Sequence, residues 1–212
     1  MNRERRLFLD YGGLIVNYDF NRDTLARAHA LVLSRINCDG QRFDIEQISE
    51  AHSKAIQAYL DARERDNSEW SMDKITGLML SNLGVDVPVS DISEIYKFND
   101  HNSEPMPKAI LALERLLSNA KLGIISNLPH DSLIYELKSY GILNLFDPIV
   151  VSYEVGFRKP HPAIYQEALR RANAKAEDSI FASHDAEEVR GAKNVGMRGI
   201  LVKSIEEVIG IL

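Results

Sequence analysis

An aspartate stands where a short apolar run meets a glycine turn near the start of the chain. Leu7-Phe8-Leu9 is followed by Asp10, and glycines occupy positions 12 and 13. A carboxylate at the end of a buried strand can attack an electrophile, while nearby backbone N–H groups bind the negative charge that develops. The glycines let the backbone approach that anion closely. A turn-capping aspartate explains the same residues, so Asp10 becomes a candidate nucleophile only if other reactive groups join it.

Hydroxyl, amide and amine groups occur at two further junctions. Ser126 and Asn127 end an apolar run, and both side chains could bind phosphate oxygens, although ordinary turn chemistry explains them equally well. Lys159 is followed by Pro160 and by Pro162, which is suited to the first turn of a helix. A lysine held by flanking prolines can point inward and neutralise a carboxylate and a phosphate together, whereas most lysines are solvated.

An acidic turn, residues 183–188, follows another apolar run and contains His184, Asp185 and Glu188. Acids three residues apart are favourable at the positive N-terminal end of a helix, and this alone accounts for Asp185 and Glu188. They could also bind a metal ion or orient Lys159, because Mg²⁺ prefers carboxylate, carbonyl and water oxygens. Each of these signals is weak when it is taken alone.

Strand and helix patterns alternate after residue 105, which predicts a doubly wound parallel sheet with right-handed crossovers. The strands are expected at residues 7–9, 122–125, 149–151, 179–182 and 200–202. The helices are expected at residues 107–119, 131–140, 162–172 and 187–195, with a last one opened by a capping box at residues 204–207. Sites in such Rossmann-like α/β folds lie beyond the carboxyl ends of the strands, so this topology would bring the candidate residues together.

The stretch between residues 20 and 103 has helical periodicity, which predicts a bundle inserted after the first strand. Its helices are expected at residues 22–35, 45–65, 71–83 and from a cap at residues 90–91 onward. The chain would then consist of an α/β core, residues 1–16 and 104–212, and an inserted helical domain, residues 17–103. His52, Tyr59 and Trp70 could face a substrate, but their helical spacing favours packing inside the bundle.

The composition limits the classes of partner. The formal net charge of −6 and the pI of about 5.5 argue against binding to nucleic acid or to an anionic membrane, because both need a basic face. Cys38 is the single cysteine, so no disulfide can form within the chain, and a reducing cytosol is expected. The sequence has neither a signal-peptide pattern nor an apolar run long enough to span a membrane. We expect a cytoplasmic monomer or homodimer that acts on a small molecule.

Taken in order, these signals resemble the four motifs of the haloacid dehalogenase-like hydrolase superfamily, which carries a helical cap after its first motif. As they stand in the chain, the segments are Leu7-Phe8-Leu9-Asp10-Tyr11-Gly12-Gly13-Leu14, Leu122-Gly123-Ile124-Ile125-Ser126-Asn127, Gly156-Phe157-Arg158-Lys159-Pro160-His161-Pro162 and Ile180-Phe181-Ala182-Ser183-His184-Asp185-Ala186-Glu187-Glu188. Residues 191–197, Gly-Ala-Lys-Asn-Val-Gly-Met, are similar to a family segment that follows the fourth motif. The resemblance spans the whole chain.

The resemblance implies a phosphatase that acts on a small phosphate monoester through an aspartyl-phosphate on Asp10. The catalytic residues would be Asp10, Lys159 and Ser126. The substrate would be bound by Gly12, Gly13, Ser126, Asn127 and His184. A Mg²⁺ cofactor would be bound by Asp10, the carbonyl of Gly12, Asp185 and Glu188.

Two departures from the family pattern leave alternatives open. The family's general acid/base aspartate is replaced by Gly12, a loss worth about two to four orders of magnitude in rate. The expected metal-binding aspartate is replaced by His184, a poor ligand for Mg²⁺; it could transfer protons or simply bond within the turn. One alternative is a metal-independent 2-haloacid dehalogenase-like hydrolase, in which Glu188 would activate water. The other is a catalytically reduced member that binds a phosphorylated ligand or a protein partner.

Overall fold

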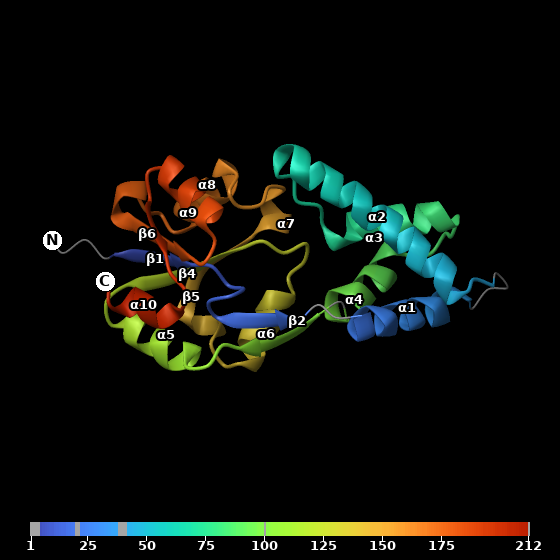
Figure 1. Cartoon of the computed structure of the whole chain (residues 1–212), viewed down its shortest axis with the longest axis horizontal. Coiled ribbons are helices and arrows are strands. Elements are labelled where there is room, and N and C mark those ends of the chain that lie inside the picture. The colour runs from blue at the N-terminus through green and yellow to red at the C-terminus, as the bar shows by residue number, and fades with distance from the viewer. Residues whose placement is uncertain (1–4, 20–21, 38–41, 100, 212) are drawn as a thin grey trace. The chain divides into compact units, whose positions relative to one another are not determined.

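The chain forms two compact units, shown in Figure 1. The computed structural model describes residues 5–19, 22–37, 42–99 and 101–211, and Cys38 lies outside them. The first unit, which we call the core unit, consists of Met1–Tyr18 and Ser103–Leu212. The second, which we call the helical unit, is Asp19–Asn102. The boundaries expected from the sequence, at residues 16/17 and 103/104, lie within two residues of these.

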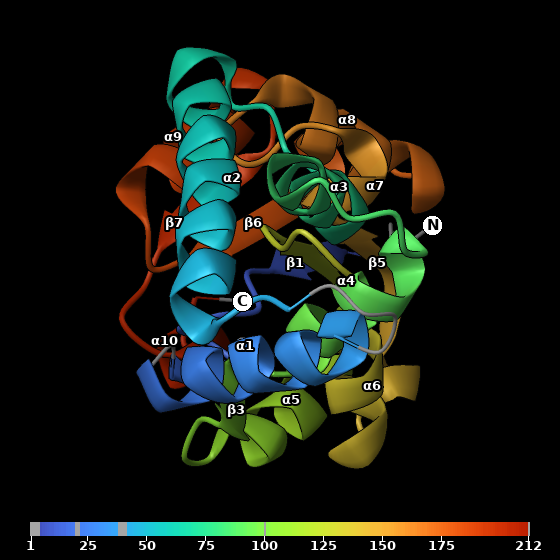
Figure 2. The ribbon, with the colours of Figure 1, turned by 90° about the vertical axis from the view of Figure 1, so that its right-hand side faces the viewer.

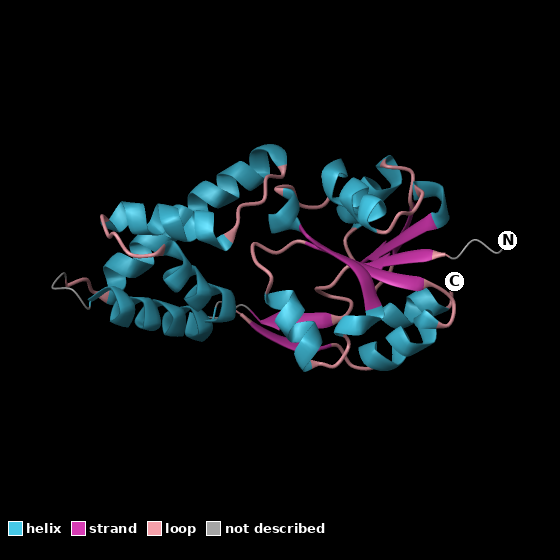
Figure 3. Ribbon diagram, turned by 180° about the vertical axis from the view of Figure 1, so that it is seen from behind, coloured by secondary structure: helices cyan, strands magenta, loops and turns pink. Residues whose placement is uncertain are grey.

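The central sheet of the core unit, whose strands are magenta in Figure 3, is parallel. Its five strands lie in the order β5-β4-β1-β6-β7. They are β1 (Arg6–Leu9), β4 (Lys121–Ser126), β5 (Phe146–Val151), β6 (Ser179–Ser183) and β7 (Arg198–Leu201). Leu9 of β1 is paired with Ile124 on one side and with Ala182 on the other. Because β1 is central and Asp10 follows it, Asp10 lies in the middle of the carboxyl edge. The predicted doubly wound parallel sheet is confirmed.

Side chains of β1 alternate between two hydrophobic cores, one on each face of the sheet. Leu7 and Leu9 pack with buried residues of α5 (Ala109–Leu117), α6 (Ser132–Ser139) and α10 (Ile205–Ile209). Phe8 packs on the other face, against α8 (Pro162–Arg171) and α9 (Ala186–Asn194). Figure 1 shows these two helix layers on opposite sides of the strands. Burial on both faces explains why the β1 sequence is apolar without alternation.

Shorter elements complete the core unit. They are the helix α7 (Ser152–Val155), the 3₁₀ turns η2 (Leu143–Leu145) and η3 (Ala176–Asp178), and a two-stranded sheet of β2 (Val16–Asp19) and β3 (Asn102–Pro105), where the chain leaves for the helical unit and returns. Strands β2 and β3 are not among the predicted elements, because four-residue strands with several polar side chains carry little periodic signal.

In its described residues the helical unit contains four helices, seen in Figure 2: α1 (Arg22–Ile36), α2 (Ile45–Asp66), α3 (Met72–Leu83) and α4 (Val89–Asn99). They surround a core of their own, to which Ile48, Ile75 and Met79 contribute fully buried side chains. His52 and Tyr59 are also buried within this unit, as the helical spacing indicated. No described helix combines the length and the apolar character that crossing a bilayer requires.

The first residues and caps of several helices differ from those predicted. The capping box expected at residues 204–207 is wrong, because the Ser204 side chain accepts no hydrogen bond from the first turn of α10. A complete capping box is present instead at Asp44, whose carboxylate accepts from the Gln47 N–H while the Gln47 side chain returns the bond. Helix α4 begins at Val89, directly after Pro88, and not at the expected Ser90 cap.

Candidate active site

Asp10 is held at the carboxyl edge of the sheet by its own backbone and by two donors to one carboxylate oxygen. Its N–H donates to the carbonyl of Ala182 at 2.9 Å, which continues the pairing of β1 with β6. Its Oδ1 accepts from the N–H of Tyr11 at 2.9 Å and from Nζ of Lys159 at 2.5 Å. The side chain of Asp10 is 7% exposed and that of Lys159 is fully buried. A carboxylate and an ammonium group therefore lie in contact inside the protein.

The second carboxylate oxygen of Asp10 has longer contacts. Oδ2 lies 3.2 Å from Nδ1 of His184 and 3.3 Å from Oγ of Ser183. Burial raises the pKa of Asp10, but the charges and hydrogen bonds of Lys159 and His184 outweigh it and hold the pKa below its ordinary value. Asp10 is therefore ionised at neutral pH, which is the form that a nucleophile needs.

Lys159 is positioned through its backbone by Asn127, the residue after β4. The N–H of Lys159 donates to Oδ1 of Asn127 at 2.7 Å, and Nδ2 of Asn127 donates to the carbonyl of Lys159 at 3.3 Å. Burial lowers the pKa of Lys159, but Asp10 and Glu188 together raise it above its ordinary value, so the amine stays charged. Asn127, expected to bind substrate, instead clamps the lysine in this structure.

Glu188, on the first turns of α9, forms the other half of the lysine's surroundings. Its Oε2 accepts from Nζ of Lys159 at 3.0 Å and from Oγ of Ser183 at 2.7 Å, and its Oε1 accepts from Nδ2 of Asn127 at 3.2 Å. The Ser183 hydroxyl has one hydrogen, and the shorter distance assigns it to Glu188 rather than to Asp10. His184 is thus the main donor to Oδ2 of Asp10.

His184 reaches Asp10 across a glycine. Gly13 has φ +77°, and a Cβ at that position would lie 2.6 Å from Cε1 of His184, closer than real Cβ contacts. The hydrogen bond to Asp10 raises the pKa of His184 above 6.5, against a smaller lowering by burial. The N–H of Gly13 donates to the carbonyl of Val16 at 2.8 Å. The Gly13 N–H therefore bonds within the turn and the glycine makes room for the imidazole, while the binding of substrate by Gly13 stays a prediction.

Three other predicted site residues lie near this cluster in different surroundings. Asp185 caps α9, its Oδ1 accepting from the N–H groups of Glu187 and Glu188. Gly12 lies against the ring of Tyr18, which a Cβ would approach to 3.2 Å. The hydroxyl of the buried Ser126 makes no hydrogen bond within the described part of the chain, so it can donate to a ligand.

Two features of this site were not recognised in the sequence. The first is the role of Ser183 between two carboxylates. The second is the close packing of α9 on the loop of Lys159, where a Cβ at Gly191 would lie 2.7 Å from the carbonyl oxygen of Pro160. The hydroxyl of Tyr165 donates to the carbonyl of Glu188 at 2.7 Å and further fixes this helix. Only the glycine in the segment that follows the fourth motif signalled such an approach.

A family model described as haloacid dehalogenase-like hydrolase matches residues 38–202, which is most of the chain. The chain belongs to this family. The glyceraldehyde 3-phosphate phosphatase of Methanothermobacter thermautotrophicus is 41% identical over 102 residues, a segment that covers 47% of this chain and 45% of that protein. The match therefore spans less than half of the length of this curated relative.

Solved structures of the haloacid dehalogenase-like family share the fold. The 2-haloacid dehalogenase from Pseudomonas syringae pv. Tomato DC3000 has a TM-score of 0.68 at 17% identity, covering 98% of this chain and 97% of that one. The HAD-hydrolase YfnB from Bacillus subtilis, solved bound to magnesium, has a TM-score of 0.57 at 18% identity, covering 100% and 99%. At these identities the likeness concerns the fold alone.

The donor set that the family resemblance implied for Mg²⁺ is not assembled here. Asp185 is a helix cap, Glu188 is bonded to Lys159, and the free side of Asp10 faces His184. The described residues contain no group of three or more His, Cys, Asp or Glu side chains arranged to hold a metal ion. Mg²⁺ requires near-octahedral oxygen ligands, so these residues do not fit it. In this arrangement Asp185 and Glu188 use their carboxylates elsewhere, and the binding of Mg²⁺ by Asp10, Gly12, Asp185 and Glu188 stays a prediction from the family resemblance.

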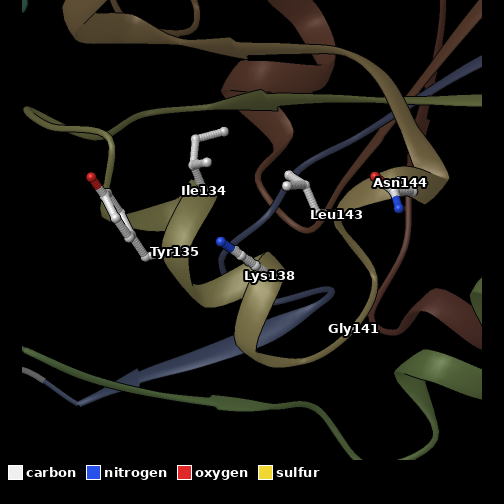
Figure 4. A pocket seen from close by; sticks show the side chains of 6 residues that line it. All are labelled: Ile134, Tyr135, Lys138, Gly141, Leu143 and Asn144. Atoms are coloured by element: carbon white, nitrogen blue, oxygen red, sulfur yellow. The ribbon is translucent and has the colours of Figure 1, made fainter.

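A separate cavity of about 470 Å³ lies beside α6 and η2 (Figure 4). It is lined by Ile134, Tyr135, Lys138, Gly141, Leu143 and Asn144. None of the site residues around Asp10 contributes to it. It is therefore not part of the candidate active site.

Proposed function

We propose that this chain hydrolyses small phosphate monoesters through a covalent aspartyl-phosphate on Asp10. The observation that carries the proposal is the ionised, buried carboxylate of Asp10 in direct contact with the ammonium group of Lys159 at 2.5 Å. Ser126, at the end of the neighbouring strand, has a hydroxyl that makes no hydrogen bond among the described residues. A purely structural ion pair would not require such an unbonded hydroxyl, whereas a phosphate-binding site would use it.

In the first step an oxygen of Asp10 forms a bond to phosphorus, and the bond from phosphorus to the alcohol oxygen breaks. The alcohol leaves with a proton from water or from a neighbouring acid. In the second step water attacks phosphorus, inorganic phosphate leaves, and Asp10 is regenerated. Lys159 stays charged throughout and balances the added negative charge of the phosphoryl group, to which Ser126 donates a hydrogen bond.

The absence of a side chain at Gly12 favours one class of substrate. No acid at this position can protonate the leaving group, so esters whose alcohols are acidic enough to leave as anions will react best. Aryl phosphates belong to this class. The relative named glyceraldehyde 3-phosphate phosphatase supports a small phosphorylated substrate.

One observation favours a second candidate, metal-independent hydrolysis of a 2-haloacid. Hydrogen bonds and ion pairs connect the side chains of one cluster, formed by Asp10, Lys159, Ser183, Asn127 and Glu188. Among the described residues no group of acidic side chains is arranged to hold a metal ion. In this reaction Asp10 would displace halide from carbon, and water would then hydrolyse the resulting ester.

The two candidates are separated by product assays on the purified chain. Release of inorganic phosphate from p-nitrophenyl phosphate and from alkyl phosphates is measured beside release of chloride from 2-chloropropionate, each for the natural chain and for Asp10→Asn. The matched control is Asp86→Asn, which removes an exposed carboxylate of the helical unit. Phosphate release that is lost only in Asp10→Asn supports the first candidate, and chloride release with the same pattern supports the second. Equal rates in Asp10→Asn and the natural chain would refute both.

A further inference from the structure

We propose that His184 occupies the place of a divalent cation in this hydrolase centre, and that reaction at Asp10 needs no metal ion. The inference concerns the site of the proposed function, but its main readout, cation binding, does not depend on turnover. It is carried by the geometry around Oδ2 of Asp10.

The imidazole of His184 lies beside the second carboxylate oxygen of Asp10. Nδ1 of His184 lies 3.2 Å from Oδ2 of Asp10, while Oδ1 is already taken by Tyr11 and Lys159. The ring lies on the backbone of Gly13 so closely that any Cβ there would collide with Cε1, Nδ1 and Nε2. The imidazole is therefore built into the turn after β1 and covers the open side of the carboxylate, where a cation would have to bind.

The neighbouring acids, Glu188 and Asp185, already accept hydrogen bonds from the protein. Both oxygens of Glu188 accept hydrogen bonds, from Lys159, Ser183 and Asn127. Asp185 uses its carboxylate to cap α9 through two backbone N–H groups. Neither acid therefore offers an unbonded carboxylate to a cation at Oδ2 of Asp10, and the imidazole beside that oxygen prefers softer metals than Mg²⁺.

The groups around His184 carry a net negative charge. The charged groups that face His184 are Asp10, Glu188 and Lys159, and they sum to one negative charge. Nδ1 of His184, 3.2 Å from Oδ2 of Asp10, places the imidazole against this negatively charged cluster. With its side chain half exposed, the ring also has a solvent-facing edge that can meet a phosphoryl oxygen. The imidazole can therefore supply beside the nucleophile the hydrogen-bond stabilisation of negative charge that a metal would otherwise supply.

The test is binding of Mn²⁺, followed by its electron paramagnetic resonance signal, to the natural chain, Asp10→Asn and His184→Asp. Asn194→Asp, which adds a carboxylate at the exposed far end of α9, is the matched control. We expect no stoichiometric binding to the natural chain or the control, and at least about tenfold tighter binding to His184→Asp because a carboxylate replaces the imidazole. Any phosphate or chloride release by the natural chain should be unchanged by a chelator.

Two results would overturn the proposal. One is stoichiometric Mn²⁺ binding by the natural chain that Asp10→Asn abolishes. The other is absence of binding in every variant, since it would show that something other than His184 keeps cations out. Thermal melting of each variant verifies that it is folded. If no substrate is turned over but His184→Asp alone gains Mn²⁺, the reaction assignment fails and the role of His184 stands.

Discussion

Replacing Lys159 by methionine removes the positive charge on which the cluster depends while keeping the length of the side chain. The lysine side chain is fully buried, and its amine donates to Asp10 at 2.5 Å and to Glu188 at 3.0 Å. Methionine fills the same space but leaves two carboxylates facing each other without a cation. The variant therefore tests electrostatics with little change in packing.

The size of the effect follows from the two lost bonds. Hydrogen bonds to charged groups contribute about 1.5–3 kcal/mol each, which gives a loss of about 3–6 kcal/mol. Breaking a buried ion pair by removing one partner costs about 3–5 kcal/mol, in the same range. We expect Lys159→Met to lower the free energy of unfolding by about 4 kcal/mol at pH 7. Lys203→Met, an exposed lysine of the same unit, should change it by less than about 0.5 kcal/mol.

The loss should shrink as the pH falls. In the natural chain the pKa of Asp10 is lowered, so its contribution to stability is present above the unfolded value of about 3.9 and is lost only as the pH falls through the lower folded value. In the variant, burial raises the carboxyl pKa with less opposition, so folding takes up a proton. The variant should therefore gain stability between pH 7 and pH 5, while Asp10 contributes no such change to the natural chain.

Urea unfolding followed by circular dichroism at pH 7 and pH 5 measures both effects. Adding Glu188→Gln to Lys159→Met removes one of the two facing carboxylates and should recover part of the stability. A loss below about 1 kcal/mol, equal at both pH values and unaffected by Glu188→Gln, would refute the buried-pair account of the site.

Other substitutions probe the surroundings of the cluster. Gly13→Ala should cost about 1–3 kcal/mol through its positive φ and should displace His184, seen as a changed imidazole signal in NMR spectra; an unshifted signal would contradict the contact. Gly191→Ala should lower stability by about 1–3 kcal/mol by pushing α9 from the lysine loop, and a neutral urea midpoint would show that the helix can yield. Gly12→Asp should raise alkyl phosphate hydrolysis about tenfold or more, and aryl phosphate hydrolysis less; equal factors for both esters would exclude leaving-group protonation. The pKa of His184, raised by Asp10, should lie above 6.5 in NMR titrations, so its contribution to stability is full below about pH 6.5 and is lost as the pH rises through the folded value; a value at or below 6.5 would contradict it.

The sheet and its reactive edge could be predicted because apolar strands and strand-end residues repeat along the sequence. Asp10 follows a run that is buried on both faces, and the alternation of strands and helices fixes which end of the sheet it occupies. The positions of β2 and β3 could not be predicted, since their pairing depends on residues about 85 positions apart in sequence, and such separation leaves no local pattern.

Which residues lie at the site was easier to predict than what each of them does there. Asn127 has the same donors whether it binds phosphate or clamps Lys159, and the choice depends on the path of a distant loop. Asp185 and Glu188 stand three residues apart in both a metal site and a helix cap, and the direction of each side chain decides between them. The position of the His184 imidazole depends on the missing side chain of Gly13. This dependence cannot be predicted from the sequence of the acidic turn, because Gly13 follows another strand.

The central claim is that Asp10 becomes covalently phosphorylated, and acid quenching in the first turnovers followed by peptide mass spectrometry tests it most directly. The account predicts that the peptide containing Asp10 gains the mass of one phosphoryl group, that the gain disappears in Asp10→Asn, and that a chelator does not prevent it. Phosphate release without any labelled peptide, or a phosphoryl group on another residue, would contradict it.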